Sequence, residues 1–438
     1  MEIYKSKHFI TAPIVIDECN KLLNNKEYEK LLSLIKNFVL TVFRSPGIHN
    51  QTLFLQEFDE ILLKISQDLK FNRDKNQAGV NDLNIIIGTE FYSVGGHTRI
   101  AKEIAAHKKN TIVILTDAYS RCDKNFHYYR QFQDLFASTP LLVLPPGLML
   151  EKINYFIQLL NVLNPRSAVI MTHHDDPIGI VAVAQSDIYR KIYYHHCDYN
   201  PALGATIKSF HHYDLSPYVE SICKEHTKSN YLPLMYKTKH LDKIKFNKDE
   251  EFNLLCSGSL IKFNFSDENS KSYYPKVISE ILNTNNCKFY HIGDLGASEL
   301  SLIERNLHFN NIDLSRFCYL GAVPDIPKII FNLINPVYIS SFPIPGGLTL
   351  VEVLSTGVPL LQFNYKNSNS DFFISDYTYA SLLPKSAIKF DDIFELNELL
   401  LGLKENYNDV TCGNISYFEE FHSESAVHYE LEKMFNLN

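Results

Sequence analysis

One stretch of the sequence combines glycines, a threonine and a glutamate in an order that suits the binding of an anion. Within Phe342–Leu361, the Pro-Gly-Gly segment 345–347 is expected to be a loop whose glycines let a ligand approach the backbone. A helix is expected from near Thr349 to Gly357, and its first N–H groups and its dipole favour a phosphate. Thr349 and Glu352 also fit the capping-box pattern, so capping and turn chemistry alone would explain the same residues.

Histidines and acids gather after three apolar runs in the first half of the chain. The run 83–88 leads to a turn with Gly-Gly-His-Thr, 167–171 leads to His-His-Asp-Asp, and 191–194 leads to His-His-Cys-Asp. Histidine and aspartate exchange protons readily, which suits general acid–base chemistry. A single histidine in a strand-end turn is more often structural than catalytic, but several turns at one edge favour a site. The expected catalytic residues are His196, Asp198, His97 and Asp176.

A metal site is not expected in these turns. The neighbouring side chains of His173, His174, Asp175 and Asp176 rarely converge on one ion, and no matching Cys/His pair lies nearby in the sequence. The segment with His211, His212 and Asp214 is assigned to a surface loop and left out of the candidate site.

Elements that position these residues follow from the hydrophobic pattern. Short apolar runs alternate with helical patterns, which is typical of a parallel sheet with helices on both faces. In such sheets ligands bind at the carboxyl ends of the strands, where the polar turns lie. The expected strands are 83–88, 111–116, 141–144, 167–171 and 191–194, then 252–256, 287–292, 317–320, 336–341 and 360–363.

The series of strands stops and restarts, which predicts an α/β protein with two doubly wound, Rossmann-like domains. A helical extension is expected over residues 1–75, a first domain over 76–236 and a second over 237–438. The C-terminal run 417–435 is expected to be helical, and the last helix could cross back to the first domain.

Composition sets limits on the class of protein. A chain of 438 residues is too long for one ordinary core. Its formal net charge of −8 argues against a nucleic-acid partner. Eight scattered cysteines, without a C-x-x-C pair or a zinc-type spacing, indicate a reduced, cytoplasmic setting. No signal-peptide pattern and no long apolar run is present, so membrane contact, if any, is expected to be peripheral, at the inner face.

The two halves, with a Gly-Gly turn after the first strand and Gly-Gly-x-Thr-x-x-Glu late in the second, resemble glycosyltransferases of the GT-B fold. The likeness covers roughly residues 83–438 as an architecture. It implies a bacterial hexosyl- or N-acetylhexosaminyl-transferase of polysaccharide biosynthesis that uses a nucleotide-sugar, most simply a UDP-sugar, in its second half. It implies an acceptor in the first half, which is a glycan, a lipid-linked glycan or a protein side chain, and no metal or other cofactor.

The resemblance also implies roles for individual residues. Glu352 would bind the ribose of the donor, and Lys262 would neutralise the leaving phosphate. The other donor-binding residues would be Gly95, Gly96, Gly258, Gly346, Gly347, Leu348 and Thr349.

Two positions depart from the pattern of many relatives. Ile344 stands where a large retaining family has a first acid, and Ser259 stands where many relatives have arginine. The stereochemistry therefore stays open, and so do two alternatives. One is a nucleotide-sugar epimerase with a GT-B-like fold, and the other is a partner subunit of this fold without catalysis.

Overall fold

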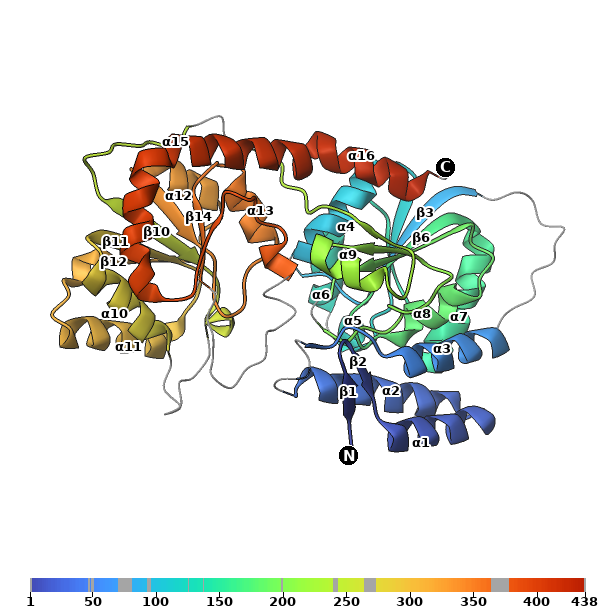
Figure 1. The fold of residues 1–438 in the computed structure, drawn as a ribbon. Helices are drawn as coiled ribbons and strands as arrows, with labels where there is room; N and C mark the ends of the chain where they lie inside the picture. The colour runs from blue at the N-terminus through green and yellow to red at the C-terminus, as the bar shows by residue number, and fades with distance from the viewer. Residues whose placement is uncertain are drawn as a thin grey trace. The chain divides into compact units, whose positions relative to one another are not determined.

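The structure is a computed structural model, and it forms two compact units that are coloured along the chain in Figure 1. Unit 1 comprises Met1–Leu232 and His428–Asn438, and unit 2 comprises Pro233–Val427. The residues that the structure describes are 2–45, 48, 51–69, 81–92, 96–124, 126–136, 138–197, 200–238, 243–263, 273–363 and 378–436.

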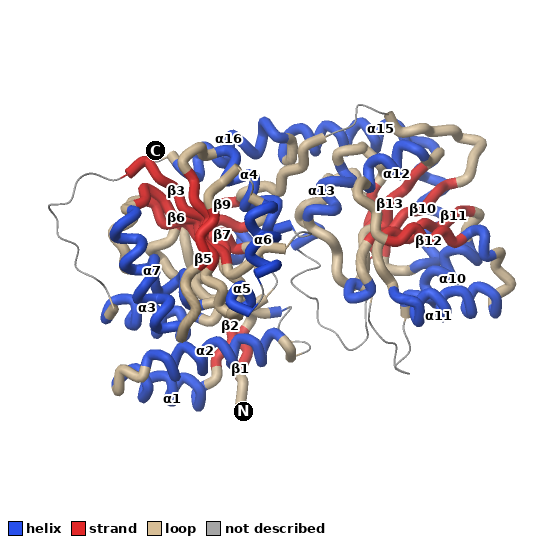
Figure 2. Tube along the Cα trace, turned by 180° about the vertical axis from the view of Figure 1, so that it is seen from behind, coloured by secondary structure: helices blue, strands red, loops and turns tan. Residues whose placement is uncertain are grey.

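Unit 1 is built on a seven-stranded parallel sheet with the order β5-β4-β3-β6-β7-β8-β9. Helices lie on both sides of this sheet (Figure 2). The chain adds strands outward from β3 in one direction and from β6 in the other, so the order reverses between these two strands. The strands are β3 (Asn81–Gly88), β4 (Thr111–Leu115), β5 (Leu141–Val143), β6 (Pro165–Met171), β7 (Arg190–His195), β8 (His211–Asp214) and β9 (Ser229–Tyr231). The helices are α4 (Gly96–His107), α5 (Arg121–Lys124), α6 (Phe126–Leu135), α7 (Met149–Leu163), α8 (Pro177–Ala184) and α9 (Pro217–Cys223).

The central strands of unit 1 are hydrophobic because helices cover both of their faces. Ile85, Ile86 and Ile87 of β3 are consecutive and have no exposed surface. An unbroken apolar run of this kind is the pattern of a parallel strand inside an α/β sheet. The five strands expected in this half are confirmed as β3 to β7, with ends that differ by at most two residues.

The surface loop expected around His211 is wrong, because these residues form strand β8 of the same sheet. His212 and Asp214 are buried, with 1% and 0% of their surface exposed. The strand has little apolar character, so its hydrophobic pattern gave no signal. Its polar side chains contact other polar groups inside the fold, and the Nε2 of His212 lies 3.0 Å from the Oδ1 of Asp214.

The N-terminal extension packs as part of unit 1. It contains helices α1 (Pro13–Asn24), α2 (Tyr28–Phe43) and α3 (Gln56–Asp68), after a small hairpin of β1 (Tyr4–Ser6) and β2 (Phe9–Thr11). Asp59 of α3 is buried and accepts hydrogen bonds from the backbone N–H groups of Gly204 and Thr206. Glu29 of α2 accepts the N–H group of Leu150 at the start of α7. These polar contacts fix the extension to the sheet domain.

Unit 2 has a six-stranded parallel sheet with the order β12-β11-β10-β13-β14-β15, which reverses between β10 and β13. The five strands expected here are confirmed as β10 to β14, and β15 and α11 were not expected. The strands are β10 (Phe252–Ser257), β11 (Cys287–Ile292), β12 (Phe317–Gly321), β13 (Pro336–Ile339), β14 (Leu360–Phe363) and β15 (Ile388–Phe390). The helices are α10 (Tyr274–Thr284), α11 (Gly296–Phe309), α12 (Ile326–Asn332), α13 (Leu348–Leu354), α15 (Leu396–Phe421) and α16 (Glu424–Phe435), with a 3-10 turn η2 (Leu260–Lys262).

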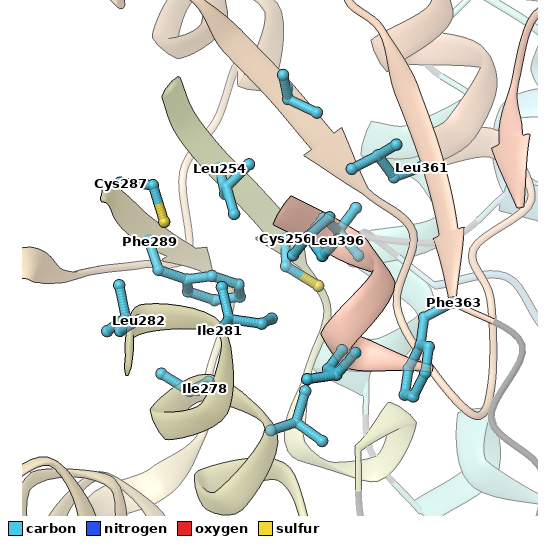
Figure 3. Packing of buried hydrophobic residues seen from close by; sticks show 14 of the residues in the cluster. Leu254, Cys256, Ile278, Ile281, Leu282, Cys287, Phe289, Leu361, Phe363 and Leu396 are labelled. Atoms are coloured by element: carbon cyan, nitrogen blue, oxygen red, sulfur yellow. The ribbon is translucent and has the colours of Figure 1, made fainter. Parts of the chain in front are cut away.

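The core of unit 2 lies between this sheet and the helices α10 and α15 (Figure 3). Leu254 and Phe289 from neighbouring strands pack with Ile278 of α10 and Leu396 of α15. Cys256 lies in the same cluster, fully buried, where a thiol behaves as a small hydrophobic group. This core holds the strand ends that carry the glycine loops.

The run 417–435 is helical as expected, and it consists of two helices that are separated by a break at His422 and Ser423. His422 is buried, and its Nδ1 lies 2.8 Å from the carbonyl oxygen of Leu234. Beyond the break, Met434 accepts a hydrogen bond from the Nε of Arg190 in β7 through its carbonyl oxygen. Residues 428–438 thereby belong to unit 1. Among the described residues, no helix is both long and apolar enough to cross a membrane.

Backbone contacts hold the turns that follow β10, β11 and β12 against one another. Gly293 has a φ of +121°, and a Cβ at this position would lie 2.2 Å from the carbonyl oxygen of Gly258. The N–H group of Gly258 donates to Ile292 at 2.8 Å, and that of Gly293 donates to Gly321 at 2.7 Å. The first turn of unit 2 therefore keeps its shape only with glycine at position 293.

We predict that Gly293→Ala lowers the free energy of unfolding by about 2–3 kcal/mol, because the new methyl group meets backbone that cannot rotate away. Gly296→Ala is the matched control, since its φ of +73° is also left-handed but a Cβ there meets nothing within 4 Å. The control should lose only about 1 kcal/mol. Differential scanning calorimetry of both variants measures this, and equal losses would show that the contact with Gly258 is unimportant.

Candidate functional site

The residues expected to hold a phosphate meet where the strand order of unit 2 reverses. Lys262 ends the turn after β10, and its Nζ donates to the carbonyl oxygen of Pro345 at 2.9 Å. A Cβ on Gly346 would lie 3.6 Å from this Nζ and 3.8 Å from the Oγ1 of Thr349. The ammonium group and the threonine hydroxyl therefore approach the same side of a bare glycine. In open α/β sheets, ligands bind in the crevice that forms at such a reversal.

Glycine at position 258 lets the lysine side chain fold across the turn. A Cβ on Gly258 would lie 2.9 Å from the Cδ of Lys262. The backbone of Lys262 is tied to the opposite loop as well, because its carbonyl oxygen accepts the N–H group of Ile344 at 3.4 Å. Burial lowers the pKa of Lys262 to about 8, which is the expected effect of taking an ammonium ion out of water. A bound anion would relieve this cost by supplying the opposite charge.

The start of α13 differs from the expected capping box. Gly347 is the N-cap and makes no side-chain cap hydrogen bond, while Thr349 and Glu352 lie inside the helix. The helix begins one residue earlier than Thr349 because glycine is tolerated at an N-cap. Thr349 is therefore not needed as a cap. Glu352 is buried, with 8% of its surface exposed, on the third position after Thr349.

Gly347 is held tightly by its neighbours. A Cβ there would lie 2.7 Å from the ring of Tyr379 and 3.5 Å from the side chain of Leu234. Leu348 follows as the first residue of α13. The first N–H groups of a helix have no partner within the helix, so they are available to an acceptor. Tyr379 is a neighbour of the site that the sequence did not suggest, because it lies far along the chain.

Three histidines gather at the carboxyl edge of the sheet in unit 1. The rings of His97 and His196 are nearly parallel, with centroids 5.2 Å apart. The ring of His173 lies 5.8 Å from that of His97 and 6.4 Å from that of His196. They come from α4, from the turn after β6 and from the turn after β7. The structure thus brings together two residues expected from the sequence and adds His173.

A tyrosine links His173 to a buried carboxylate. The hydroxyl of Tyr119 donates to the Oδ1 of Asp175 at 2.6 Å, and its oxygen lies 3.2 Å from the Nδ1 of His173. Since the one hydroxyl proton goes to the carboxylate, the tyrosine oxygen accepts the Nδ1–H of His173. These two hydrogen bonds fix the tautomer of His173, with its proton on Nδ1 and its lone pair on Nε2. The sequence gave no hint of Tyr119 beyond its place after an apolar run.

Burial keeps this histidine cluster neutral. It lowers the pKa of His173 to about 3, and the nearby rings add to the effect. It also lowers the pKa of His97 and of His196. Neutral imidazoles each carry one nitrogen lone pair at physiological pH, so the cluster can accept a proton or a hydrogen bond from a hydroxyl group.

The catalytic role expected for Asp176 is not what the geometry supports. Its Oδ1 accepts the N–H group of Ile178 at 2.9 Å, which makes it the N-cap of α8. Its Oδ2 accepts the hydroxyl groups of Thr89 and Thr116. With no exposed surface and both oxygens engaged, Asp176 holds the sheet and helix together.

Two of the expected site residues, Asp198 and Gly95, lie outside the described residues. Gly96 is the first residue of α4, directly before His97. The structure describes only residues near them in the chain, Gly96 after Gly95 and Cys197 before Asp198.

A buried histidine supports the turn under Lys262 and makes stability depend on pH. The Nε2 of His291 lies 3.2 Å from the carbonyl oxygen of Gly258, and its Nδ1 lies 2.7 Å from the hydroxyl of Tyr274. Burial lowers its pKa to about 4. Between about pH 6.5 and 4 the unfolded chain binds a proton here that the folded chain does not. The contribution of His291 to the free energy of unfolding is therefore fully present above this pH range and is lost as the pH falls through it.

We predict that His291→Gln flattens the acid loss of stability by up to about 1.4 kcal/mol per pH unit between about pH 6 and 4.5, relative to the wild type. Urea unfolding at a series of pH values measures this slope. His308→Gln, at an exposed position of α11, is the control. An unchanged slope in His291→Gln would show that this histidine does not stay neutral in the fold.

Comparison with known proteins supports the architecture. No family model matches the sequence, and no curated protein matches it. Several solved structures match over 80% of this chain. HepE of Anabaena in complex with UDP has a TM-score of 0.56 and 12% identity, with 98% of that chain covered. The lipopolysaccharide outer core galactosyltransferase WaaB has a TM-score of 0.54 and 12% identity, also with 98% covered.

MurG of Acinetobacter baumannii is a further match, with a TM-score of 0.50 and 11% identity over 80% of this chain and 99% of that one. Identities of this size show the fold alone. The expected fold class is confirmed: this chain consists of the two parallel-sheet domains of the GT-B fold.

Proposed function

We propose that this protein is a glycosyltransferase that moves a sugar from a nucleotide-sugar, with a UDP-sugar as the expected donor. The observation that carries the proposal is the convergence of Lys262, Gly346 and Thr349 at the strand reversal of unit 2. A partly buried ammonium group beside a bare glycine and a hydroxyl suits the diphosphate of such a donor. HepE, one of the matching structures, was solved with UDP.

The donor would be held by unit 2. Lys262 would balance the charge of the leaving diphosphate, and the backbone around Gly346, Gly347 and Leu348 would supply N–H donors. Glu352, four residues into α13 after Leu348, is our candidate for accepting the hydroxyl groups of the ribose. We propose that this neutralisation needs no metal ion.

The acceptor hydroxyl would be activated by unit 1. In the transfer, the hydroxyl oxygen bonds to the anomeric carbon, the bond from that carbon to the diphosphate oxygen breaks, and the hydroxyl proton leaves. The neutral His173, oriented through Tyr119 and Asp175, would accept a hydrogen bond from this hydroxyl through its Nε2. Because its pKa is lowered, it would take the proton only as the oxygen bonds to the anomeric carbon and the hydroxyl becomes strongly acidic. His97 and His196 would hold the hydroxyl in place. The acceptor would be a glycan, a lipid-linked glycan or a protein side chain, in a bacterial pathway of surface polysaccharides.

We propose that this activity takes place in the cytoplasm, because the scattered cysteines suit a reduced compartment. A lipid-linked acceptor would bring the protein to the inner face of the membrane as a peripheral contact. An epimerase would share the donor site but release free sugar products without an acceptor, and a partner subunit would bind nucleotide without turnover. Two features favour the last alternative: Ile344 in place of an acid found in one retaining family, and Ser259 where many relatives have arginine.

The first test is a thermal-shift panel with UDP, GDP, CMP, ADP and dTDP, each with and without magnesium. We expect one nucleotide, UDP, to raise the melting temperature without magnesium. A positive result is followed by product analysis with sugars of that nucleotide. A transferred sugar supports the proposal, free sugar products indicate an epimerase, and binding without any product indicates a partner subunit. No shift with any nucleotide would contradict the donor site.

We predict that Lys262→Met weakens UDP binding by about 10- to 100-fold, which corresponds to the loss of a hydrogen bond to a charged group. Lys262→Arg should recover part of the affinity because it keeps the charge. Isothermal titration calorimetry at constant salt measures this. Lys288→Met removes an exposed lysine of β11 and should leave the affinity unchanged. Equal affinity of Lys262→Met and the wild type would remove Lys262 from the donor site.

We predict that Tyr119→Phe lowers turnover about 100-fold and leaves UDP affinity unchanged, because the link that orients His173 is lost while the donor site stays intact. Steady-state transfer assays with the identified donor and acceptor measure this. Tyr155→Phe, at an exposed position of α7, serves as the control. Normal turnover in Tyr119→Phe would show that the Asp175–Tyr119–His173 series has no part in the reaction.

A further inference from the structure

Four side chains that can bind a metal ion converge inside unit 1, and none of them is among the residues proposed above to act in the transfer. His195 is the last residue of β7, His212 and Asp214 lie on β8, and Cys223 is the last residue of α9. The exposed fraction is 1% for each histidine and 0% for Asp214 and Cys223. Their ligand atoms all lie within 4.8 Å of one another.

Four separations among these ligand atoms are shorter than, or close to, those of a tetrahedral metal site. The Oδ1 of Asp214 lies 3.0 Å from the Nδ1 of His195 and 3.0 Å from the Nε2 of His212. The Sγ of Cys223 lies 3.4 Å from the same oxygen and 3.7 Å from the Nδ1 of His195. Zinc bonds are about 2.0–2.2 Å to nitrogen or oxygen and about 2.3 Å to sulfur. Tetrahedral angles then place the ligand atoms about 3.3–3.6 Å apart.

Hydrogen bonding alone explains this cluster poorly. Three groups, His195, His212 and Cys223, all point at the single oxygen Oδ1 of Asp214. A carboxylate oxygen has two lone-pair sites, so three protons would compete for them. The other oxygen, Oδ2, accepts the hydroxyl of Ser229. One cation among the four ligand atoms would remove this competition.

We propose that His195, His212, Asp214 and Cys223 bind a structural Zn²⁺ ion. Two imidazoles, one carboxylate and one thiolate are ligands that zinc prefers, and four protein ligands close its tetrahedral shell. The carboxylate and the thiolate together carry two negative charges, so the ion makes the buried site neutral. The hydrogen bond from Ser229 of β9 to the carboxylate orients that ligand in the way outer partners of metal sites do.

Such an ion would join three elements of unit 1. It would tie the end of β7 to β8 and to the end of α9, at the side of the sheet where the hydrophobic pattern is weakest. His195 directly precedes His196, so the ion would also fix the backbone that carries one member of the histidine cluster. This ion would be structural, and the transfer itself would still need no metal.

The test uses the full chain with its affinity tag removed, because a histidine tag binds metals itself. Elemental analysis of protein grown with added zinc should give about one Zn²⁺ per chain. Replacing the ion with Co²⁺ should give the absorption of tetrahedral cobalt together with a thiolate-to-cobalt charge-transfer band. Protein without either metal at stoichiometric level, in both measurements, would overturn the proposal.

Variants identify the ligands. Cys223→Ser should lose the charge-transfer band and bind Co²⁺ more than tenfold more weakly. Cys197→Ser removes another thiol that lies near a histidine, His196, and should keep the band. Cys19→Ser, an equally buried cysteine of unit 1, controls for the loss of a buried thiol. An unchanged band in Cys223→Ser, or its loss in Cys197→Ser, would overturn the assignment.

Melting temperatures measured with and without a chelator test the proposal on the wild type as well, so the test does not depend on how well a variant folds. A chelator should lower the melting temperature of the wild type and of Cys19→Ser, because binding to the folded state alone stabilises it. The same chelator should leave Cys223→Ser unchanged. A wild-type melting temperature that does not respond to the chelator, in protein shown to have lost its zinc, would contradict a structural role for the ion.

Discussion

The constraint on which the rest depends is the parallel direction of all strands in both sheets. Parallel strands send every following turn to the same edge, so residues far apart in the sequence meet there. Where the strand order reverses, the chain leaves two neighbouring strands in opposite directions. No connection then passes over the space between the turns that follow these strands. In unit 2 these are the turns with Lys262 and Gly346, and in unit 1 those with His97 and His173. The chemistry of the protein gathers at these two places because the chain begins each sheet in its middle.

The buried polar groups show how this edge is kept in order. Asp176 joins two strands to the start of α8 through its two threonine partners and its cap. His291 contacts the carbonyl oxygen of Gly258 and so stabilises the turn after β10 in unit 2. In each case a polar side chain at a strand end replaces the apolar packing of the sheet interior. Such groups resemble catalytic residues in a sequence, because they have the same types and the same positions.

This explains how far the sequence could predict the structure. The central strands, such as β3 and β13, were predicted because they are runs of apolar residues that are buried on both faces. Strand β8 was missed because its pattern is His-His-Tyr-Asp, and its stability comes from partners in other elements. The resemblance to GT-B glycosyltransferases pointed to Gly258, Lys262 and Gly346, and the structure brings these residues together at two neighbouring strand ends. The link through Tyr119 could not be predicted, because it depends on the path of a loop. The metal ligands were missed for the same reason: their spacing follows the fold and no known zinc motif.

The path of the last helix has a consequence for how the molecule is made. In sequence terms, unit 2 is an insertion between two segments of unit 1, since residues from His428 onward return to it. Glu432 pairs with Lys108 after α4, and Met434 accepts a hydrogen bond from Arg190 of β7. A ribosome releases these residues only after the whole of unit 2 has been synthesised. Unit 1 can therefore begin to fold first. Unit 2 is nevertheless the first unit to be synthesised completely, because unit 1 still lacks its C-terminal segment at that point.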